Sequence, residues 1–375
     1  MKQFDFNVYK GNSKYVSFFD EYIKENGEVK KDLFKKLDIS DSSYNRLRGC
    51  ETNIGNTIIN LLSSNYNLLQ ISNDSINKLS NLITKIYNNM NYRIFDSYDS
   101  DLKIIDKMIK DNSIMFPILY LIKLFMKVNV NLIITRIRKE DIELYNIVKR
   151  YEKFYTNDLL EILNFLSVIF EDELTLDMCI NINNNPMTYH VLSLRYYLEE
   201  KYEYAYYYAE KAKNILIDES NYKRLIMVNR VIIDSLLNLN EFDKALDYAQ
   251  KNKLSLMALN FNDEISIYDN YIAISFLGLR RYKDIINLLF MKKDLSELST
   301  IETICYIASI NMIISKHNIY DDSDNINNIE SLYKGLDKKM VVCVNSYLYK
   351  KDLNILNELG KNGATKSLIR VLRNI

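Results

Sequence analysis

The side chains of Asn45 and Arg46 are neighbours in a polar stretch and have the chemistry that base recognition needs. A guanidinium can donate two hydrogen bonds to guanine, and a carboxamide can pair with adenine in the same way. Asp41 could only accept a hydrogen bond from cytosine and would repel phosphate. For Arg46 and for nearby Arg48, the alternative is a solvated helix surface. These residues form a recognition site only if one exposed helical turn presents them.

A second set of polar side chains, between residues 190 and 270, could bind an extended peptide. Carboxamide and guanidinium groups suit the backbone and the carboxylate of such a ligand. Arg230 and Asp234 are four residues apart, so they could instead pair with each other on one helix. Ligand contact and structural packing both remain open for this set, which consists of His190, Tyr197, Asn229, Arg230, Asp234, Asn238 and Asn270.

The sequence contains no pattern typical of an active site. His190 and His317 are the only histidines, and neither has a cysteine or a cluster of carboxylates near it in sequence, which argues against zinc. There is no phosphate-binding glycine loop and no GxSxG motif. The acidic residues form no motif that singles out an acid and base pair. We therefore expect a protein that is not an enzyme and that uses neither a cofactor nor a metal.

The segment from residue 30 to 49 predicts two short helices joined by a tight turn. Its apolar residues recur at helical spacing, and Asp38 lies where the chain must reverse. Ser40 is placed to cap the second helix, whose first turn is free of bulky apolar groups. Such a helix N-terminus could enter a major groove. Because two short helices cannot bury their own apolar faces, we expect supporting helices near residues 15–23 and 54–62.

The sequence LFKKLDISDSSYNRLRGCETNIGNTIINLLSSNYNL resembles the Xre/Cro-type helix-turn-helix. It departs from that family at Phe34, where a small residue usually lets the two helices approach, and at Asp38, where the turn usually has glycine. The resemblance implies base contacts from the start of the second helix and phosphate contacts from the start of the first. The residues that would bind double-stranded DNA are Lys30, Lys31, Ser40, Asp41, Ser42, Asn45, Arg46 and Arg48.

Charge gives this segment only modest attraction for DNA. Residues 30–48 contain six basic and three acidic side chains, an excess of three. The whole chain has 49 basic and 49 acidic residues, so it has no general affinity for polyanions. One subunit would bind phosphate weakly, and we expect a dimer that places two such segments on two half-sites.

Composition predicts an all-α fold. The chain of 375 residues has 8 glycines and 2 prolines, and no glycine occurs between residues 56 and 277. A β-rich domain could hardly form its turns with so few of these residues. The most apolar stretch, near residues 114–135, is interrupted by polar residues and by Pro117, which predicts a buried helix pair rather than a membrane span. The four cysteines are widely spaced and the first residues have no apolar signal core, so we expect a reduced, cytoplasmic location.

A repeat of 40 residues organises the middle of the chain. Tyr202, Phe242 and Tyr282 occupy equivalent positions, and small residues follow the first two at fixed distances. The phrases YYLEEKYEYAYYYAEKAK, LLNLNEFDKALDYAQKN and FLGLRRYKDIINLLFMK resemble the tetratricopeptide repeat, in which stacked helix pairs form a superhelix with a concave wall. The third unit has Ile285 and Leu289 in place of small residues, so we expect wider packing there.

The combination of segments resembles the RRNPP-type peptide-sensing regulators, the group of Rgg, PlcR, PrgX and the arbitrium receptors. The resemblance implies a helix-turn-helix domain at residues 1–70 and a repeat domain at residues 71–375, clearest at 187–292. It also implies a homodimeric transcription regulator of the quorum-sensing type, with a short signalling peptide in the concave groove. Apolar residues between Met340 and Leu348 are candidates for the dimer contact. The alternative is a Rap-like adaptor or a scaffold that binds a protein partner instead of DNA.

Overall fold

The computed structural model describes residues 2–6, 9, 20–25, 27, 29–48, 73–111, 115–131, 138–171, 185–290, 296, 298–316 and 333–375. Every regular element within these residues is a helix, which confirms the predicted all-α class. The chain divides into two compact units. Unit 1 comprises Met1–Arg195 and Asn214–Leu225, and unit 2 comprises Tyr196–Lys213 and Ile226–Ile375.

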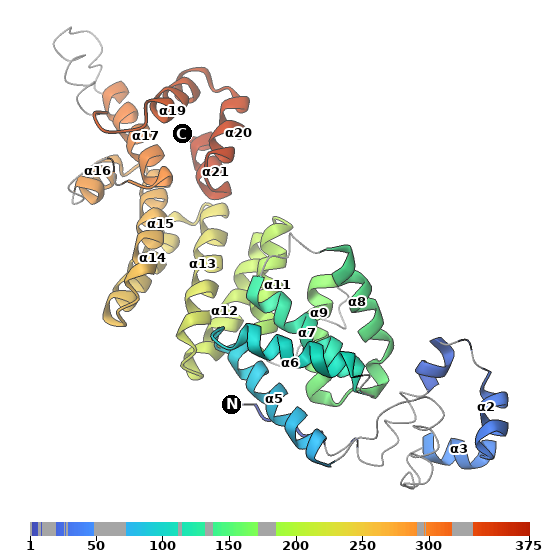
Figure 1. Cartoon of the computed structure of the whole chain (residues 1–375). Coiled ribbons are helices and arrows are strands. Elements are labelled where there is room, and N and C mark those ends of the chain that lie inside the picture. The colour runs from blue at the N-terminus through green and yellow to red at the C-terminus, as the bar shows by residue number, and fades with distance from the viewer. Residues whose placement is uncertain are drawn as a thin grey trace. The chain divides into compact units, whose positions relative to one another are not determined.

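Unit 1 contains the predicted helix-turn-helix segment together with the first helices of the array (Figure 1). The domain boundary predicted at residue 70 lies outside the described residues, and so do most of the two predicted supporting helices; of these, only residues 20–25 are described, and they are helical. The helices of unit 1 are α2 (Lys30–Leu37), α3 (Asp41–Arg48), α5 (Asn73–Asn91), α6 (Tyr98–Lys110), α7 (Phe116–Asn131), α8 (Lys139–Arg150), η3 (Glu152–Phe154) and α9 (Asn157–Phe170).

Three helices, α11 (Pro186–Leu198), α12 (Tyr202–Asp218) and α13 (Tyr222–Asn238), contribute residues to both units. The remaining helices belong to unit 2, where α14 and α15 pack closely against each other. The helices of unit 2 are α14 (Phe242–Ala258), η4 (Asn262–Glu264), α15 (Ile265–Gly278), α16 (Tyr282–Phe290), α17 (Thr300–Lys316), α19 (Lys338–Lys350), α20 (Leu353–Lys361) and α21 (Lys366–Asn374).

The helix pairs follow the predicted repeat. Their second helices, α12, α14 and α16, begin at Tyr202, Phe242 and Tyr282, as the sequence spacing predicts. The alanines at the expected small positions of α12 and α14 are fully buried, and so are Ile285 and Leu289 of α16. The repeat of helix pairs is therefore present, whereas their assembly into a tetratricopeptide-like superhelix stays a prediction.

The five consecutive helices from α11 to α15 end in the same backbone turn. A residue in the left-handed conformation follows the helix every 20 residues, with φ between 54° and 61°. The amide after each of these residues donates to a carbonyl five residues earlier, as Arg281 does to Phe276 at 2.9 Å. This is the hydrogen-bond pattern of a Schellman motif, which usually has glycine at the left-handed position. The residues that occupy it here are Glu200, Ser220, Asn240, Asn260 and Arg280.

The first residues of the chain lie along α5 in an extended conformation. The backbone amides of Phe4 and Phe6 donate to the hydroxyls of Thr84 and Ser80, at 2.9 and 3.3 Å, and both phenylalanine rings are buried. Two residues of extended chain and four residues of α-helix span similar distances. The amides of Phe4 and Phe6 are therefore spaced to match the hydroxyls of Thr84 and Ser80. These residues therefore pack with the helical array.

The described part of the apolar stretch near residue 120 forms one buried helix, α7, and the end of the predicted pair lies outside the described residues. In α7, Ile118, Leu119 and most of the apolar residues that follow are fully buried, because α6, α8 and α9 surround it. No helix in the described part of the chain is both long enough and apolar enough to cross a membrane.

Candidate nucleic-acid and peptide interfaces

The turn between α2 and α3 has the backbone that the sequence requires. Asp38 ends α2 in the left-handed conformation, with φ 50° and ψ 42°. Ser40 then caps α3, because its hydroxyl accepts a hydrogen bond from the backbone amide of Ser43 at 3.2 Å. An aspartate tolerates the left-handed conformation better than most residues, which explains how the turn forms without glycine. The two helices meet at a steep angle (Figure 1).

An aromatic pair fills the corner between the two helices. The ring of Phe34 lies against the ring of Tyr44, with their centroids 4.6 Å apart. Tyr44 is buried, and its hydroxyl donates to the carboxylate of Asp20 at 2.7 Å. Phe34 and Tyr44 thus hold α2 and α3 together at this corner. The pair fixes which face of α3 points inward.

The opposite face of α3 is exposed and polar. Asn45 lies four residues after Asp41, and Arg46 lies four residues after Ser42, so these side chains share one side of the helix. Lys31 at the start of α2 is exposed as well. Ser40 is exposed, but its hydroxyl is already engaged in the cap. The side chains of Lys30 and Arg48 lie outside the described residues.

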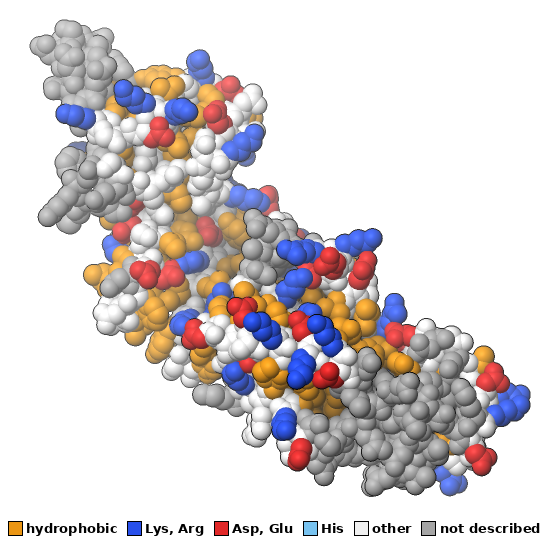
Figure 2. Space-filling view, viewed as in Figure 1, with side chains coloured by type: hydrophobic (Ala, Val, Ile, Leu, Met, Phe, Trp, Pro, Cys, Tyr) orange, Lys and Arg blue, Asp and Glu red, His pale blue; other side chains and the backbone are white. Residues whose placement is uncertain are grey.

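Charges on the visible surface are mixed. Figure 2 shows lysine and arginine side chains interspersed with aspartate and glutamate over the described residues of each unit. This distribution agrees with the neutral net charge of the chain. On this face, the described residues therefore form no broad positive surface that would attract DNA.

The predicted peptide-binding residues of unit 2 centre on Asp234 of α13. Its carboxylate accepts hydrogen bonds from the hydroxyl of Tyr271 at 2.8 Å and from that of Ser367 at 3.3 Å. Burial raises the pKa of Asp234 to about 6, against the opposing effects of these two hydroxyls and of nearby Arg230. Asp234 is therefore a partly buried carboxylate that accepts hydrogen bonds from two neutral hydroxyls.

Most of the other members of this set also have partners within unit 2. Arg230 forms an ion pair with Glu264 of η4, in place of the alternative pairing with Asp234. Tyr197 hydrogen-bonds with the side chain of Asn238, and burial raises the pKa of its hydroxyl. The remaining two have polar partners too: Asn270 accepts from Ser299 at 2.6 Å, and Asn229 donates to Asn252.

The helix α21 contacts several of these repeat helices. Ser367 reaches Asp234 of α13, while Lys366 forms an ion pair with Glu200 at 3.0 Å. The guanidinium of Arg370 lies 5.8 Å from the centre of the Tyr202 ring. Leu368 and Leu372 are fully buried on the inner face of α21. A segment of this same chain therefore covers part of the predicted peptide site.

His190 belongs to unit 1, whereas the other members of the predicted set belong to unit 2. It is fully buried, and its Nδ1 lies 3.4 Å from the guanidinium of Arg224. Arg224 is also fully buried and donates to the carbonyls of Met90 and Asn91, at 2.7 and 3.0 Å, where α5 ends. A peptide would reach His190 only if these helices separated. The position suits a structural role, because a cation stabilises a helix C-terminus.

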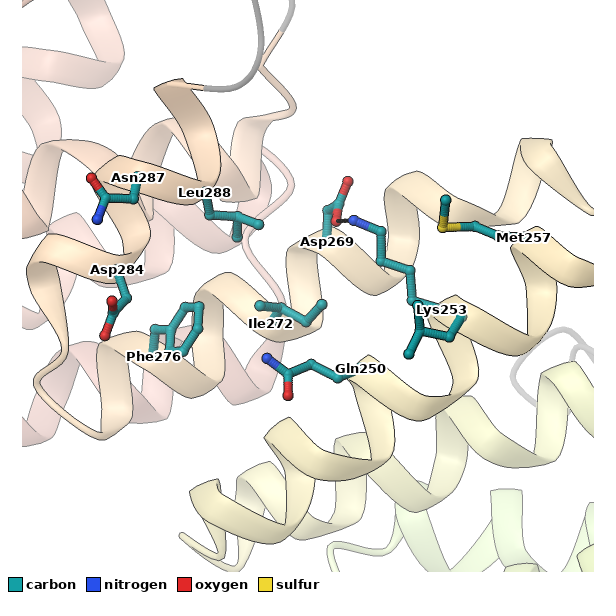
Figure 3. Close-up of a pocket in the computed structure, with 10 residues that line it drawn as sticks. Gln250, Lys253, Met257, Asp269, Ile272, Phe276, Asp284, Asn287 and Leu288 are labelled. Atoms are coloured by element: carbon teal, nitrogen blue, oxygen red, sulfur yellow. Dashed lines mark hydrogen bonds and ion pairs between the residues drawn. The ribbon is translucent and has the colours of Figure 1, made fainter.

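An open cavity of about 670 Å³ lies between α14, α15 and α16 (Figure 3). Ile272 and Phe276 lie on one face of α15 and contribute to its lining, together with Leu288 of α16. No single motif in the sequence marks this cavity. The signal that could have indicated it is the departure of the third repeat unit, since Ile285 and Leu289 replace small residues where α16 packs.

Known proteins add no further information about these sites. Comparisons with models of protein families, with curated proteins and with solved structures each found no match.

Proposed function

We propose that this chain is a DNA-binding transcription regulator controlled by a short signalling peptide. The observation that carries the proposal is the two-sided structure of α3. One side is fixed through Tyr44, while the other presents Asp41, Ser42, Asn45 and Arg46 to solvent. An amide and a guanidinium on an exposed helical face are the groups that read base edges in a major groove.

The modest charge of this face supports a dimer as the form that binds DNA. An excess of three positive charges in residues 30–48 gives one copy few phosphate contacts, and two copies on two half-sites would double them. Exposed apolar residues on α19 and α20 offer a contact surface for the second copy. Val342 and Tyr349 are each 65% exposed and are seven residues apart, and Leu353 is 61% exposed.

The repeat helices would bind the peptide and change the activity of the dimer. A peptide can shift the dimer between two arrangements only if it binds one of them better than the other. We call the predicted peptide-binding residues of unit 2 the predicted wall. Among them, Asn229, Arg230 and Asn270 supply the polar groups that an extended peptide needs, although each already has a partner in the chain. Binding there would exchange existing hydrogen bonds for new ones.

An electrophoretic shift assay with the DNA that flanks the gene tests the proposal. Arg46→Ala should weaken specific binding by about 1–3 kcal/mol for each half-site, the usual value of a bidentate contact with a base. Arg373→Ala, which removes an exposed arginine far along the chain, serves as the matched control and should leave binding unchanged. Equal binding by Arg46→Ala and by the unaltered protein would contradict the role of α3, whereas no binding by the unaltered protein would favour an adaptor that binds a protein partner.

A further inference from the structure

The predicted wall and the open cavity differ in how available their polar groups are. On the wall, Asp234 is covered by α21 and Arg230 is paired with Glu264. The cavity between α14, α15 and α16 is open, and its volume of about 670 Å³ lies within the usual range of ligand sites. A ligand could therefore enter the cavity without displacing any helix.

The centre of the cavity is apolar. Ile272 and Phe276 of α15 lie one helical turn apart, and Figure 3 shows their side chains on the same side of the helix. Leu254 and Met257 of α14 also line the cavity, although they are 66% and 51% exposed. Large apolar side chains that stay exposed beside a cavity gain free energy when a ligand covers them.

The polar groups of the lining favour an uncharged ligand. Lys253 is paired with Asp269 at 2.6 Å, and Asp284 is paired with Arg281 at 2.7 Å, so each of these charges already has its counterpart. The carboxamides of Gln250 and Asn287 have no hydrogen-bond partner within the described residues. Each can both donate and accept, which is what the backbone of a peptide requires.

We propose that this cavity binds an extended, uncharged segment of a peptide, with apolar side chains on Ile272, Phe276 and Leu288. The carboxamides of Gln250 and Asn287 would bond to its backbone from α14 and α16. This inference rests on the peptide control in the proposed function, but it locates the peptide between the second helices of two successive pairs instead of on the wall around Asp234.

A selection with full-length protein tests this location. The probe is a pool of short synthetic peptides made only of uncharged residues, from which retained peptides are identified by mass spectrometry. The affinity of one retained peptide is then measured by calorimetry. In the double variant Gln250→Ala/Asn287→Ala we expect a loss of about tenfold or more, because two hydrogen bonds are removed. Both side chains are exposed, so the variant should fold normally.

Four further variants define the outcome. Leu288→Lys should also weaken binding, whereas Asn354→Ala, an exposed control on α20, should have no effect. Asn229→Ala and Asn270→Ala on the wall should leave the affinity unchanged. Loss of binding in these wall variants, with full binding in the cavity variants, would overturn the location and leave the proposed function intact. If the unaltered protein retains no peptide, both the location and the peptide control are wrong, and the DNA assay judges the rest separately.

Discussion

Phe242 of α14 lies directly against Gly278 of α15, where any larger residue would push the ring aside. A Cβ atom at position 278 would lie 2.5 Å from Cδ1 of the Phe242 ring. Phe242 is one of the aromatic residues that recur every 40 positions, and Gly278 lies 40 residues after Asn238. The contact thus ties the second helix of one pair to the first helix of the next.

Gly278→Ala should destabilise the protein by about 1–3 kcal/mol, because an inserted methyl group must push a close-packed ring aside. This cost exceeds the gain of up to about 1 kcal/mol that alanine brings to a helix interior. Chemical denaturation measures the difference. Gly360→Ala is the control, since its Cβ would meet only the end of the Ile369 side chain, at 3.1 Å. A Gly278→Ala protein as stable as the parent would mean that α14 and α15 are not packed as described.

Arg280→Gly should stabilise the protein by about 1 kcal/mol. Arg280 has a φ of 57°, a conformation that costs residues with a Cβ atom about that amount and costs glycine almost nothing. Asn260→Gly, at the preceding turn of the repeat, should gain less because asparagine tolerates this conformation better. Denaturant titration of both variants gives the comparison. A loss of stability in Arg280→Gly would contradict the left-handed turn.

Arg224→Met should cost about 3 kcal/mol, because it removes a buried cation and the hydrogen bonds that this cation donates to the carbonyls of Met90 and Asn91. Burial and the nearby charge of Arg93 lower the pKa of Arg224 to about 9, so the guanidinium still carries its charge at neutral pH. Arg373→Met at an exposed position should change stability by less than about 0.5 kcal/mol. Similar thermal midpoints for the two variants would exclude the structural role of Arg224.

His190 should make the fold sensitive to acid. Burial, together with Arg224 and Arg93, holds the pKa of His190 well below its usual value, so the folded protein keeps the ring neutral. The unfolded chain takes up a proton below about pH 6.5, and therefore the free energy of unfolding falls as the pH drops below that value. Between about pH 7.5 and about pH 5.5, the loss should be about 1 kcal/mol larger in the unaltered protein than in His190→Gln. Equal losses would show that the ring is accessible in the folded state.

Asp234 should have the opposite effect on the pH dependence of stability, because it stabilises the fold at acid pH. Its pKa of about 6 lies above the ordinary value of 3.8, so the folded protein binds the proton more tightly than the unfolded chain does. The contribution of Asp234 to the free energy of unfolding is complete below about pH 4 and is lost as the pH rises through about 6. The helix α21 contacts Asp234 through Ser367. Its amides should therefore gain protection against hydrogen exchange between neutral pH and about pH 5 in the unaltered protein, and this gain should be absent in Asp234→Asn. Asp243→Asn, at an exposed position, is the control and should keep this gain in protection. The same change in protection in both variants would contradict the prediction.

Local spacing predicted the parts of the fold that depend on residues close in sequence. The starts of α12, α14 and α16, the cap at Ser40 and the turn at Asp38 all follow from residue types within a few positions. The wall was harder to predict, because its partners come from distant segments. Ser367 lies 133 residues from Asp234, and Arg224 lies 34 residues from His190. No helical period relates such residues, so the sequence could not show that Asp234 is covered or that His190 is interior.

Whether the protein binds DNA as a regulator is tested most directly by asking whether the purified protein retains specific genomic fragments. Genomic fragments are mixed with the full-length protein at low salt, and the retained fragments are sequenced with and without Arg46→Ala. We expect the protein to retain fragments that share a two-fold symmetric site, with an affinity that falls steeply as salt rises. The Arg46→Ala variant should lose this enrichment. Failure of the unaltered protein to enrich any fragment at low salt would contradict the claim that it is a DNA-binding regulator.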